Sequence, residues 1–373
     1  MTHVVVLGAG RVGAVMARDL APDFQVTVAD RSEEALARVK GWGLATRAAD
    51  LSKPEGVKAA VADADLVVGA VPGFMGFATA KAVLEAGKTL VDISFFDEDC
   101  FELDALAKAQ GLTAIVDVGV APGCGNIILG DTARQLDRVT KFECLVGGLP
   151  VVRTWPYEYK AGFSPIDVIE EYTRPARYVK DGKMVTFPAL SEPELLDFEG
   201  VGTLESFNTD GLRSVIRTFP GVPDMKEKTL RYPGHIEKMR MMRESGFFSK
   251  EPIQVNGQSV VPLDLTTSLL FPLWKFQEGE ADLTVMRVTV EGEKAGKPVR
   301  RVVEVLDHYD PATKTTSMAR TTGFTCTAAV RLVAAGRFTR KGICPPEYLG
   351  QEAGVWDFMK AELAKRNVVY RER

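Results

Sequence analysis

The sequence predicts an α/β fold in which a doubly wound parallel sheet is joined to a second, α+β domain with a mixed sheet. Short apolar runs alternate with helix-period segments from the N-terminus to about residue 118, a pattern typical of parallel strands covered by helices on both faces. After Pro122 the chain changes to longer polar stretches with Pro and Gly. A chain of 373 residues also exceeds the roughly 250 residues of a large single core, so two domains are expected.

Six strands are expected in the first domain, each a short run of mostly apolar residues. They are Val4–Leu7, Gln25–Ala29, Leu44–Ala48, Leu66–Ala70, Thr89–Ile93 and Thr113–Asp117, with helices such as Arg11–Leu20, Glu33–Lys40 and Phe101–Gln110 between them. Parallel strands joined through helices cross over with a right hand in nearly all proteins, which makes the sheet doubly wound.

The second domain is expected to contain an antiparallel hairpin within its mixed sheet. Lys141–Val146 is strand-like, and two further strand-like runs, Leu283–Glu291 and Val299–Asp307, flank the turn-rich segment Gly292–Pro298. Two such runs around a turn are typical of a β-hairpin.

The last strong helix, Thr321–Gly336, is small and apolar, which suits packing against another element. We expect it to pack on the first domain. The predicted domains are residues 1–123, with 318–350 packing back on them, and residues 124–317.

Composition and charge argue against several classes of partner. The net charge of −4 gives no overall attraction to nucleic acid. Five scattered cysteines without a C-x-x-C pair argue against a disulfide framework or a metal site and fit a reducing cytoplasm. The start MTHVVVLGAG lacks the features of a signal peptide, and the uncharged stretch Leu66–Ala80 is too short to cross a membrane as a helix.

A dinucleotide fingerprint follows the first strand. Gly8, Gly10 and Gly13 form G-x-G-x-x-G between a strand and a helix, and the second strand ends at Asp30, 22 residues beyond Gly8. The first glycine allows the tight turn, the second admits the pyrophosphate, the third lets helix and strand pack, and the acid binds the ribose hydroxyls. These residues predict a Rossmann domain that binds a nicotinamide dinucleotide, and hence an oxidoreductase.

The acid at position 30 favours NAD over NADP because Asp30 would repel a 2′-phosphate, whereas the neighbouring Arg31 leaves NADP as the alternative. Asp50, after the third strand, is expected near the adenine, with an exposed loop carboxylate as the alternative. In open α/β sheets the ligand lies beyond the carboxyl ends of the strands. The remaining residues expected at the cofactor are Arg11, Val12, Val71, Pro72, Asp92, Ser94 and Val120.

Seven stretches of the chain resemble the saccharopine dehydrogenase (reductase) and L-lysine 6-dehydrogenase family, and are most similar to lysine 6-dehydrogenases. They run through nearly the whole chain, including the second domain. They are Asp117–Asn126 (DVGVAPGCGN), Val146–Pro150 (VGGLP), Ser164–Lys180 (SPIDVIEEYTRPARYVK), Glu205–Ser214 (ESFNTDGLRS), Thr229–Arg243 (TLRYPGHIEKMRMMR), Ser317–Thr325 (SMARTTGFT) and Gly342–Leu349 (GICPPEYL).

The resemblance implies NAD-dependent oxidation of the lysine ε-amine to 2-aminoadipate 6-semialdehyde and ammonia, or hydride transfer with NAD(P) at the secondary amine of saccharopine. In both reactions hydride moves between nicotinamide C4 and a carbon bearing nitrogen, through an imine. Saccharopine reductases usually carry an acidic residue where this chain has Ala121. Lysine-biosynthetic reductases generally lack an acidic residue at the position of Asp30. Both differences favour the lysine 6-dehydrogenase reaction over the saccharopine reaction. The family also suggests a homodimer formed through the second domain's sheet.

A non-catalytic dinucleotide-binding sensor is the alternative from another class, since a fold alone does not prove a function. Such a protein would bind NAD without chemistry and engage a partner protein through its second domain.

An amino-acid substrate needs a partner for its α-carboxylate, and a guanidinium provides two parallel hydrogen bonds. Arg213 and Arg231 are the candidates, with a surface salt bridge as the alternative for each. Tyr159 is expected to line the pocket, and Asp210 is expected to bind the α-ammonium group.

A lysine ε-ammonium must lose a proton before hydride can leave its carbon, so a base is required. His235, at a probable helix start, is the candidate by its titration range, with a packing role as the alternative. Asp92 and Asp117 stand at strand ends that face the expected nicotinamide and are the other candidates, with a structural cap as the alternative for each.

Overall fold

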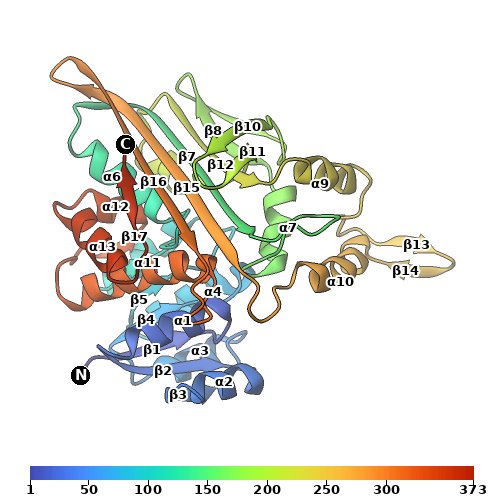
Figure 1. Ribbon diagram of the computed structural model, residues 1–373. Coiled ribbons are helices and arrows are strands. Elements are labelled where there is room, and N and C mark those ends of the chain that lie inside the picture. Colours follow the sequence, from blue (N-terminus) through green and yellow to red (C-terminus); the bar gives the residue numbers. More distant parts are fainter. The chain divides into compact units, whose positions relative to one another are not determined.

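The computed structural model describes all 373 residues, which divide into two compact units (Figure 1). Unit 1 comprises Met1–Arg138 and Ala319–Tyr370, and unit 2 comprises Val139–Met318 and Arg371–Arg373. The boundary expected after residue 123 therefore lies too early, since α6 (Cys124–Ala133) belongs to unit 1.

The reason is the close packing of α6 on α12 (Pro346–Gly350). A Cβ at Gly130 would lie 2.2 Å from the carbonyl oxygen of Glu347, so only glycine allows this approach. The side-chain amide of Asn126 also donates a hydrogen bond to the Glu347 carboxylate at 3.1 Å.

Unit 1 is built on a seven-stranded sheet in the order β3-β2-β1-β4-β5-β6-β17, and all its strand pairs are parallel. This is the Rossmann strand order 3-2-1-4-5-6 with one strand added, so the predicted doubly wound sheet is confirmed. The strands are β1 (His3–Leu7), β2 (Gln25–Asp30), β3 (Ala45–Ala48), β4 (Leu66–Gly69), β5 (Thr89–Asp92), β6 (Thr113–Ile115) and β17 (Gly342–Cys344).

The two strands at the β6–β17 edge of this sheet differ from the expectation. β6 ends before Asp117, whose φ of 56° is incompatible with a continuing strand. β17 was not expected, because three residues are too few to produce a recognisable strand pattern.

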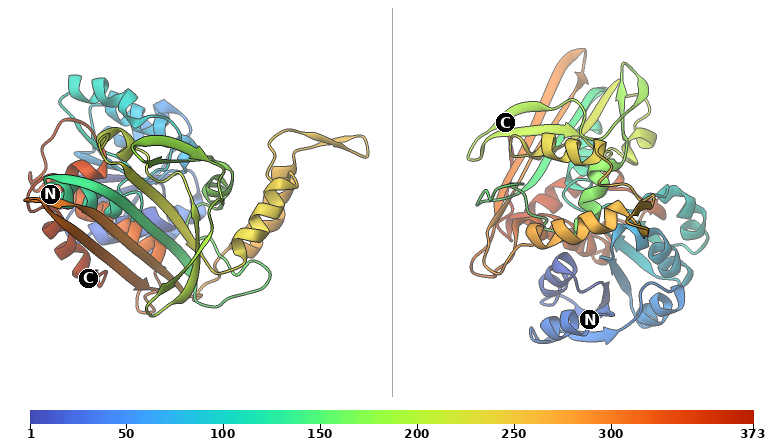
Figure 2. Two further views of the ribbon diagram at one scale, coloured as in Figure 1. Left: turned by 90° about the horizontal axis from the view of Figure 1, so that it is seen from above. Right: turned by 90° about the vertical axis from the view of Figure 1, so that its right-hand side faces the viewer.

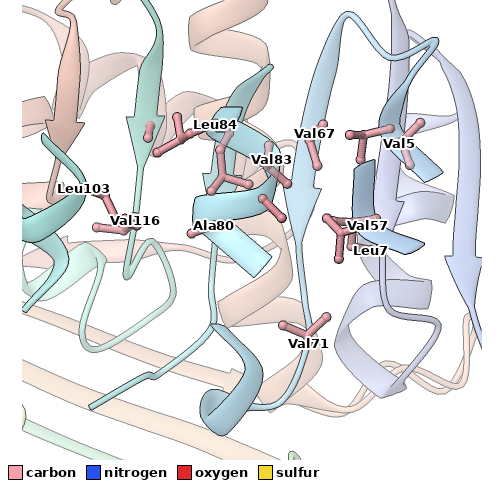
Figure 3. Packing of buried hydrophobic residues seen from close by; sticks show 14 of the residues in the cluster. Val5, Leu7, Val57, Val67, Val71, Ala80, Val83, Leu84, Leu103 and Val116 are labelled. Carbon is pink, nitrogen blue, oxygen red and sulfur yellow. The ribbon is translucent and has the colours of Figure 1, made fainter. Parts of the chain in front are cut away.

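The helices of unit 1 cover its sheet, and their apolar side chains form its core. Figure 3 shows Val83 and Leu84 of α4 among side chains of the strands, including Val5 and Val67. The predicted helix Phe101–Gln110 begins instead as a 3₁₀ turn. The helices are α1 (Arg11–Leu20), α2 (Glu33–Lys40), α3 (Pro54–Val61), α4 (Gly73–Glu85), η1 (Cys100–Leu103), α5 (Asp104–Ala109), α6, α11 (Ser317–Ala334), α12 and α13 (Val355–Ala364).

Unit 2 is built on a nine-stranded mixed sheet, as predicted: β12 is parallel to β7 and antiparallel to β8 and β11. The strands between residues 176 and 208 were not predicted from the sequence, because they contain many polar residues and show no regular alternation of buried and exposed positions. The strands are β7 (Arg138–Pro150), β8 (Ala176–Lys180), β9 (Lys183–Phe187), β10 (Glu194–Phe198), β11 (Gly202–Asn208), β12 (Asp224–Arg231), β15 (Asp282–Lys294), β16 (Lys297–His308) and β18 (Tyr370–Glu372).

The predicted hairpin is β15–β16, paired antiparallel from Leu283 opposite His308 to Lys294 opposite Lys297. Ala295 and Gly296 form its turn with φ values of 50° and 73°. Positive φ at both central residues is what a two-residue hairpin turn with the correct twist requires.

Four helices accompany this sheet: α7 (Pro165–Thr173), α8 (Val215–Thr218), α9 (His235–Glu244) and α10 (Pro262–Trp274). A separate hairpin of β13 (Ile253–Val255) and β14 (Gln258–Val260) lies between α9 and α10 along the chain. No helix in the protein is both long and apolar enough to span a membrane.

Candidate dinucleotide site and buried arginine cluster

The glycine-rich turn of unit 1 has the geometry that a pyrophosphate requires. Gly8 has a φ of 112°, and a Cβ at Gly13 would lie 2.1 Å from the carbonyl oxygen of Gly8. A Cβ at Gly10, by contrast, would meet nothing within 4 Å. The first and third glycines are therefore needed by the protein's own packing, whereas the second borders open space that a ligand can occupy.

The N-terminus of α1 faces the same turn. Arg11 and Val12 are half-buried in its first turn, which contains no acidic residue. The first amides of a helix have no intrahelical acceptor and carry a partial positive charge, so an anion is stabilised there.

Asp30 lies directly beside the glycine turn. Its carboxylate accepts hydrogen bonds from the backbone amides of Ala9 at 2.7 Å and Ser32 at 2.8 Å. Arg38 donates to the carbonyl oxygen of Ala9 at 2.6 Å and steadies the turn from the other side. The carboxylate is thus held where a ribose is expected, and the side chain of Arg31 is exposed.

The side chain of Asp50 interacts with residues that follow it closely in the sequence. Its carboxylate accepts from the amide and hydroxyl of Ser52 and pairs with Lys53 at 3.3 Å. The hydrogen bonds from Ser52 lower the pKa of the Asp50 carboxyl. The side chain closes a turn, and its contact with adenine stays a prediction.

Asp92 and Ser94 form a buried pair at the carboxyl end of β5. The hydroxyl and the amide of Ser94 both donate to the Asp92 carboxylate, at 2.9 Å and 3.1 Å. A Cβ at Gly69 would lie 1.8 Å from the same carboxylate. Asp92 therefore organises the strand end, and its catalytic role stays a prediction, as does that of the buried Asp117.

The other residues expected at the cofactor lie at loops that follow strands. Val71 is buried, Pro72 is exposed at the N-cap of α4, and Val120 is half-buried. Val120 belongs to a tight loop in which the amide of Cys124 donates to the carbonyl oxygen of Gly119 at 3.0 Å.

In unit 2 a buried cluster surrounds Arg231 at the end of β12. The arginine is only 2% exposed. Its Nη2 donates to Glu171 at 2.6 Å, its Nε donates to the Tyr172 hydroxyl at 3.2 Å, and its guanidinium lies 4.4 Å from the ring centre of Tyr159. Because Glu171 already neutralises this arginine, the proposed contact with a substrate carboxylate competes with an internal ion pair and stays a prediction.

His235, the first residue of α9, extends this cluster and is 1% exposed. Its Nδ1 lies 2.8 Å from the carbonyl oxygen of Tyr157, which only accepts, so Nδ1 carries the hydrogen. Its Nε2, 2.9 Å from the Tyr172 oxygen, therefore accepts from the tyrosine hydroxyl in the neutral state. A continuous chain of hydrogen bonds runs from Glu171 through Arg231 and Tyr172 to His235.

Burial, and then the charge of Arg231, lower the pKa of His235 to about 3. The sequence does not reveal that the imidazole is buried beside a guanidinium, so this lowered pKa was not expected, and the role of His235 as a base stays a prediction. Burial also raises the pKa of Tyr172 to about 12 and that of Glu171 above its usual range. His235 is neutral across the physiological range, and its direct contact with substrate stays a prediction.

Three members of this cluster were not singled out from the sequence. Glu171 and Tyr172 lie on α7, within a stretch that carries the family resemblance, and Trp274 ends α10. The indole packs edge-on against Tyr159 and Tyr172, with ring centres 5.4 Å and 6.3 Å apart. The EEY sequence of α7 was the available signal, but nothing in it identified which acid meets the arginine.

Asp210 and Arg213 belong to a different set of contacts. Both carboxylate oxygens of Asp210 accept from the Arg177 guanidinium, at 2.9 Å and 2.8 Å. A cation of the chain thus already pairs with Asp210, and the contact of Asp210 with a substrate ammonium group stays a prediction. Arg213, with a φ of 45°, is half-buried near Arg174, whose pKa is lowered by burial and then by the charge of Arg213.

Comparisons with known proteins agree with both units. Residues 4–115 match the saccharopine dehydrogenase NADP binding domain, and residues 119–368 match the saccharopine dehydrogenase C-terminal domain. The glutamate-forming, NADP(+) saccharopine dehydrogenase of Pyricularia oryzae is 23% identical over 80% of this chain and 82% of its own length. The mitochondrial alpha-aminoadipic semialdehyde synthase of Mus musculus is 25% identical over 66% of this chain, which spans only 28% of that protein.

Among solved structures, the apo saccharopine dehydrogenase (L-Glu forming) of Saccharomyces cerevisiae superimposes with a TM-score of 0.82 over 100% of this chain and 99% of that one, at 20% identity. This likeness supports the fold of the whole chain. No group of three or more His, Cys, Asp or Glu side chains is arranged to hold a metal ion.

Proposed function

Because the chain belongs to the saccharopine dehydrogenase family, whose members are NAD(P)-dependent oxidoreductases acting on carbon–nitrogen bonds, we propose that it oxidises the ε-amine of L-lysine. The carbon loses a hydride and the nitrogen loses its proton, which gives an imine. Water then converts the imine to 2-aminoadipate 6-semialdehyde and ammonia. Bound NAD supplies the hydride acceptor, nicotinamide C4.

The position of Asp30 is the observation that supports NAD as the cofactor. Its carboxylate is fixed against the amide of Ala9, at the edge of the glycine turn. There it accepts hydrogen bonds from ribose hydroxyls and repels a 2′-phosphate, which favours NAD over NADP. The open space beside Gly10 and the acid-free start of α1 leave room and positive potential for the pyrophosphate.

The buried cluster of unit 2 supports a role in substrate binding. Arg231, Tyr172 and neutral His235 form a buried polar network in which the arginine donates to the tyrosine hydroxyl and the hydroxyl donates to the imidazole, a pattern that holds side chains in one orientation. We keep Arg213 and Arg231 as candidates for the α-carboxylate, and Tyr159 as a wall of the pocket.

Saccharopine is the second candidate substrate, and the names of the relatives favour it. Those relatives are named as saccharopine dehydrogenases that use NADP(+) and form L-glutamate. The hydride step is the same, because it also passes through an imine. The alanine at position 121, where saccharopine reductases usually carry an acid, favours the lysine reaction.

All five cysteines are free and buried. Burial raises the pKa of Cys124 to about 11, so its thiol is not a reactive nucleophile at neutral pH. Unpaired thiols fit a reducing compartment, and we propose the cytoplasm as the location.

A substrate panel tests the proposal. Formation of reduced nicotinamide is followed at 340 nm with L-lysine and with saccharopine, each with NAD and with NADP. We expect turnover with L-lysine and NAD. Turnover with saccharopine alone would replace lysine by the second candidate, and dinucleotide binding without turnover of either amine would identify a sensor.

Replacing Asp30 with alanine is expected to narrow the preference for NAD over NADP by about tenfold or more, since charge-assisted hydrogen bonds to the ribose contribute roughly 1.5–3 kcal/mol. The ratio kcat/KM for each dinucleotide measures the change. Asp357→Ala is the control, because its exposed carboxylate lies on α13 of the same unit and pairs only with Lys360 of that helix. If the Asp30→Ala enzyme still does not use NADP, Asp30 is not the residue that selects NAD.

A further inference from the structure

The ion pair between Glu171 and Arg231 is exposed on one side only. Figures 1 and 2 show α7, which carries Glu171, beside α9 and α10, and side chains of these three helices pack in one core. The side chain of Arg231 is 3% exposed, whereas that of Glu171 is 21% exposed. A ligand that approaches this pair therefore meets the carboxylate before the guanidinium.

The guanidinium of Arg231 is enclosed by groups of the protein itself. Its three nitrogens donate to a carboxylate, to a hydroxyl and, at 3.0 Å, to the carbonyl oxygen of Leu230. Its central carbon lies 4.4 Å, 5.8 Å and 5.9 Å from the ring centres of Tyr159, Tyr172 and Phe207. The charge that this cluster offers to a ligand is therefore negative.

The Glu171 carboxylate keeps one oxygen for a further partner. Its Oε2 accepts from Arg231, and its Oε1 has no hydrogen-bond partner in the protein. Asp210, the acid expected to bind the substrate ammonium, instead has both oxygens bound by Arg177. Burial raises the pKa of the Glu171 carboxyl, and the charge of Asp167, one turn earlier on α7, raises it further. A cation at the available oxygen would offset both effects.

The hydroxyl of Tyr159 is a second polar group of this cluster that makes no hydrogen bond within the protein. The side chain is only 4% exposed, and its ring covers the guanidinium of Arg231. Burial raises the pKa of Tyr159, and the charges of Arg231 and Glu171 also act on it, so its hydroxyl lies near the carboxylate. Polar groups buried to this degree are usually hydrogen-bonded. Two such oxygens close together match an ammonium group, which donates up to three hydrogen bonds.

We propose that Glu171 and the Tyr159 hydroxyl bind the α-ammonium group of the amino-acid substrate. This inference rests on the proposed function, in which the ε-amine must lose its proton before hydride can leave, so the α-ammonium is the cation that remains. It donates to Oε1 of Glu171 and to the Tyr159 oxygen. Arg231 then acts as a positioning residue, because it holds the other oxygen of the same carboxylate.

Titration calorimetry of the full chain with bound NADH tests this subsite without turnover. L-Lysine is compared with 6-aminohexanoate, which keeps the carboxylate and the ε-amine but lacks the α-amine. We expect the unmodified protein to bind L-lysine about tenfold or more tightly than 6-aminohexanoate, as one charge-assisted hydrogen bond provides. Glu171→Gln should abolish most of this preference and leave the affinity for 6-aminohexanoate little changed.

Glu170→Gln is the matched control. Glu170 is the neighbouring acid on α7, its side chain is 23% exposed, and it pairs with Lys250 at 3.2 Å and with Arg174 at 4.0 Å. Its replacement removes the same charge from the same helix, and the preference for L-lysine should remain.

Tyr159→Phe gives a second test that keeps the ion pair intact. It retains the ring over Arg231 and removes only the hydroxyl, so it should weaken the binding of L-lysine and leave that of 6-aminohexanoate unchanged. This variant decides the question if Glu171→Gln does not fold.

Equal affinity of the unmodified protein for the two ligands overturns the proposal. An equal loss of affinity for both ligands in Glu171→Gln also overturns it, because the carboxylate would then only keep Arg231 in place. A preference for L-lysine that depends on Glu171, in a protein that does not oxidise L-lysine, would refute the proposed reaction and support the ammonium subsite.

Discussion

Replacing Arg231 with alanine is expected to lower the free energy of unfolding by about 3–5 kcal/mol, the usual cost of removing one partner of a buried ion pair. The guanidinium is nearly inaccessible to water, and its loss leaves the Glu171 carboxylate and the Tyr172 hydroxyl without their donor. It also removes the cation that lies over the Tyr159 ring. Urea unfolding at neutral pH measures the change.

A matched control separates this loss from the general effect of deleting an arginine. Arg300, on β16, pairs with Glu291 at 3.4 Å in an exposed position, and its replacement by alanine should cost less than about 1 kcal/mol. Glu171→Gln in the Arg231→Ala background should recover part of the loss, because a neutral amide is less costly to bury than a lone carboxylate. Additive effects of the two substitutions would contradict the ion pair.

Kinetics of the same variant address the role of Arg231 in binding. If its guanidinium also meets the substrate carboxylate, KM for the amino acid should rise with little change in NAD affinity. Arg213→Ala is measured in parallel as the other candidate. Unchanged kinetic constants in both variants would exclude these two residues from carboxylate binding.

The second large predicted effect is a decrease in the free energy of unfolding at low pH, which is caused by His235. Its folded-state pKa of about 3 lies below the ordinary value of 6.5, so between these values the unfolded chain binds a proton that the folded chain excludes. Stability therefore falls as the pH decreases from 6.5 toward 3. The loss is about 1.4 kcal/mol for each pH unit and reaches several kcal/mol in total.

His235→Asn should remove this part of the pH dependence, since an asparagine amide still donates to the Tyr157 carbonyl but does not titrate. The measurement is the difference in unfolding free energy between variant and unmodified chain, taken from pH 7 to pH 4. His308→Asn is the control, because that side chain is exposed. A difference that stays constant with pH would contradict the lowered pKa, as would a kcat profile in which His235 accounts for a limb between pH 5 and 8.

The glycine turn and its acid could be predicted from the sequence because residues that are close in sequence form their contacts. Gly8, Gly13 and Asp30 lie within one strand–helix–strand unit, and the turn between them requires glycine whatever the rest of the chain does. The substrate-binding residues could be predicted only in part from the sequence. Arg231 and His235 were selected for their chemistry, whereas the partners that determine their charge state come from other helices.

The sequence by itself determined the parallel sheet, the glycine turn with its acid, and the family. Periodicity and close-range backbone sterics specify these features within short segments. Only the tertiary structure decided that α6 belongs to unit 1, that Arg177 holds Asp210, and that Glu171 and burial control Arg231 and His235. Burial and the charge of a neighbour depend on residues that are distant in sequence, and these are the quantities that set a pKa or select an ion-pair partner.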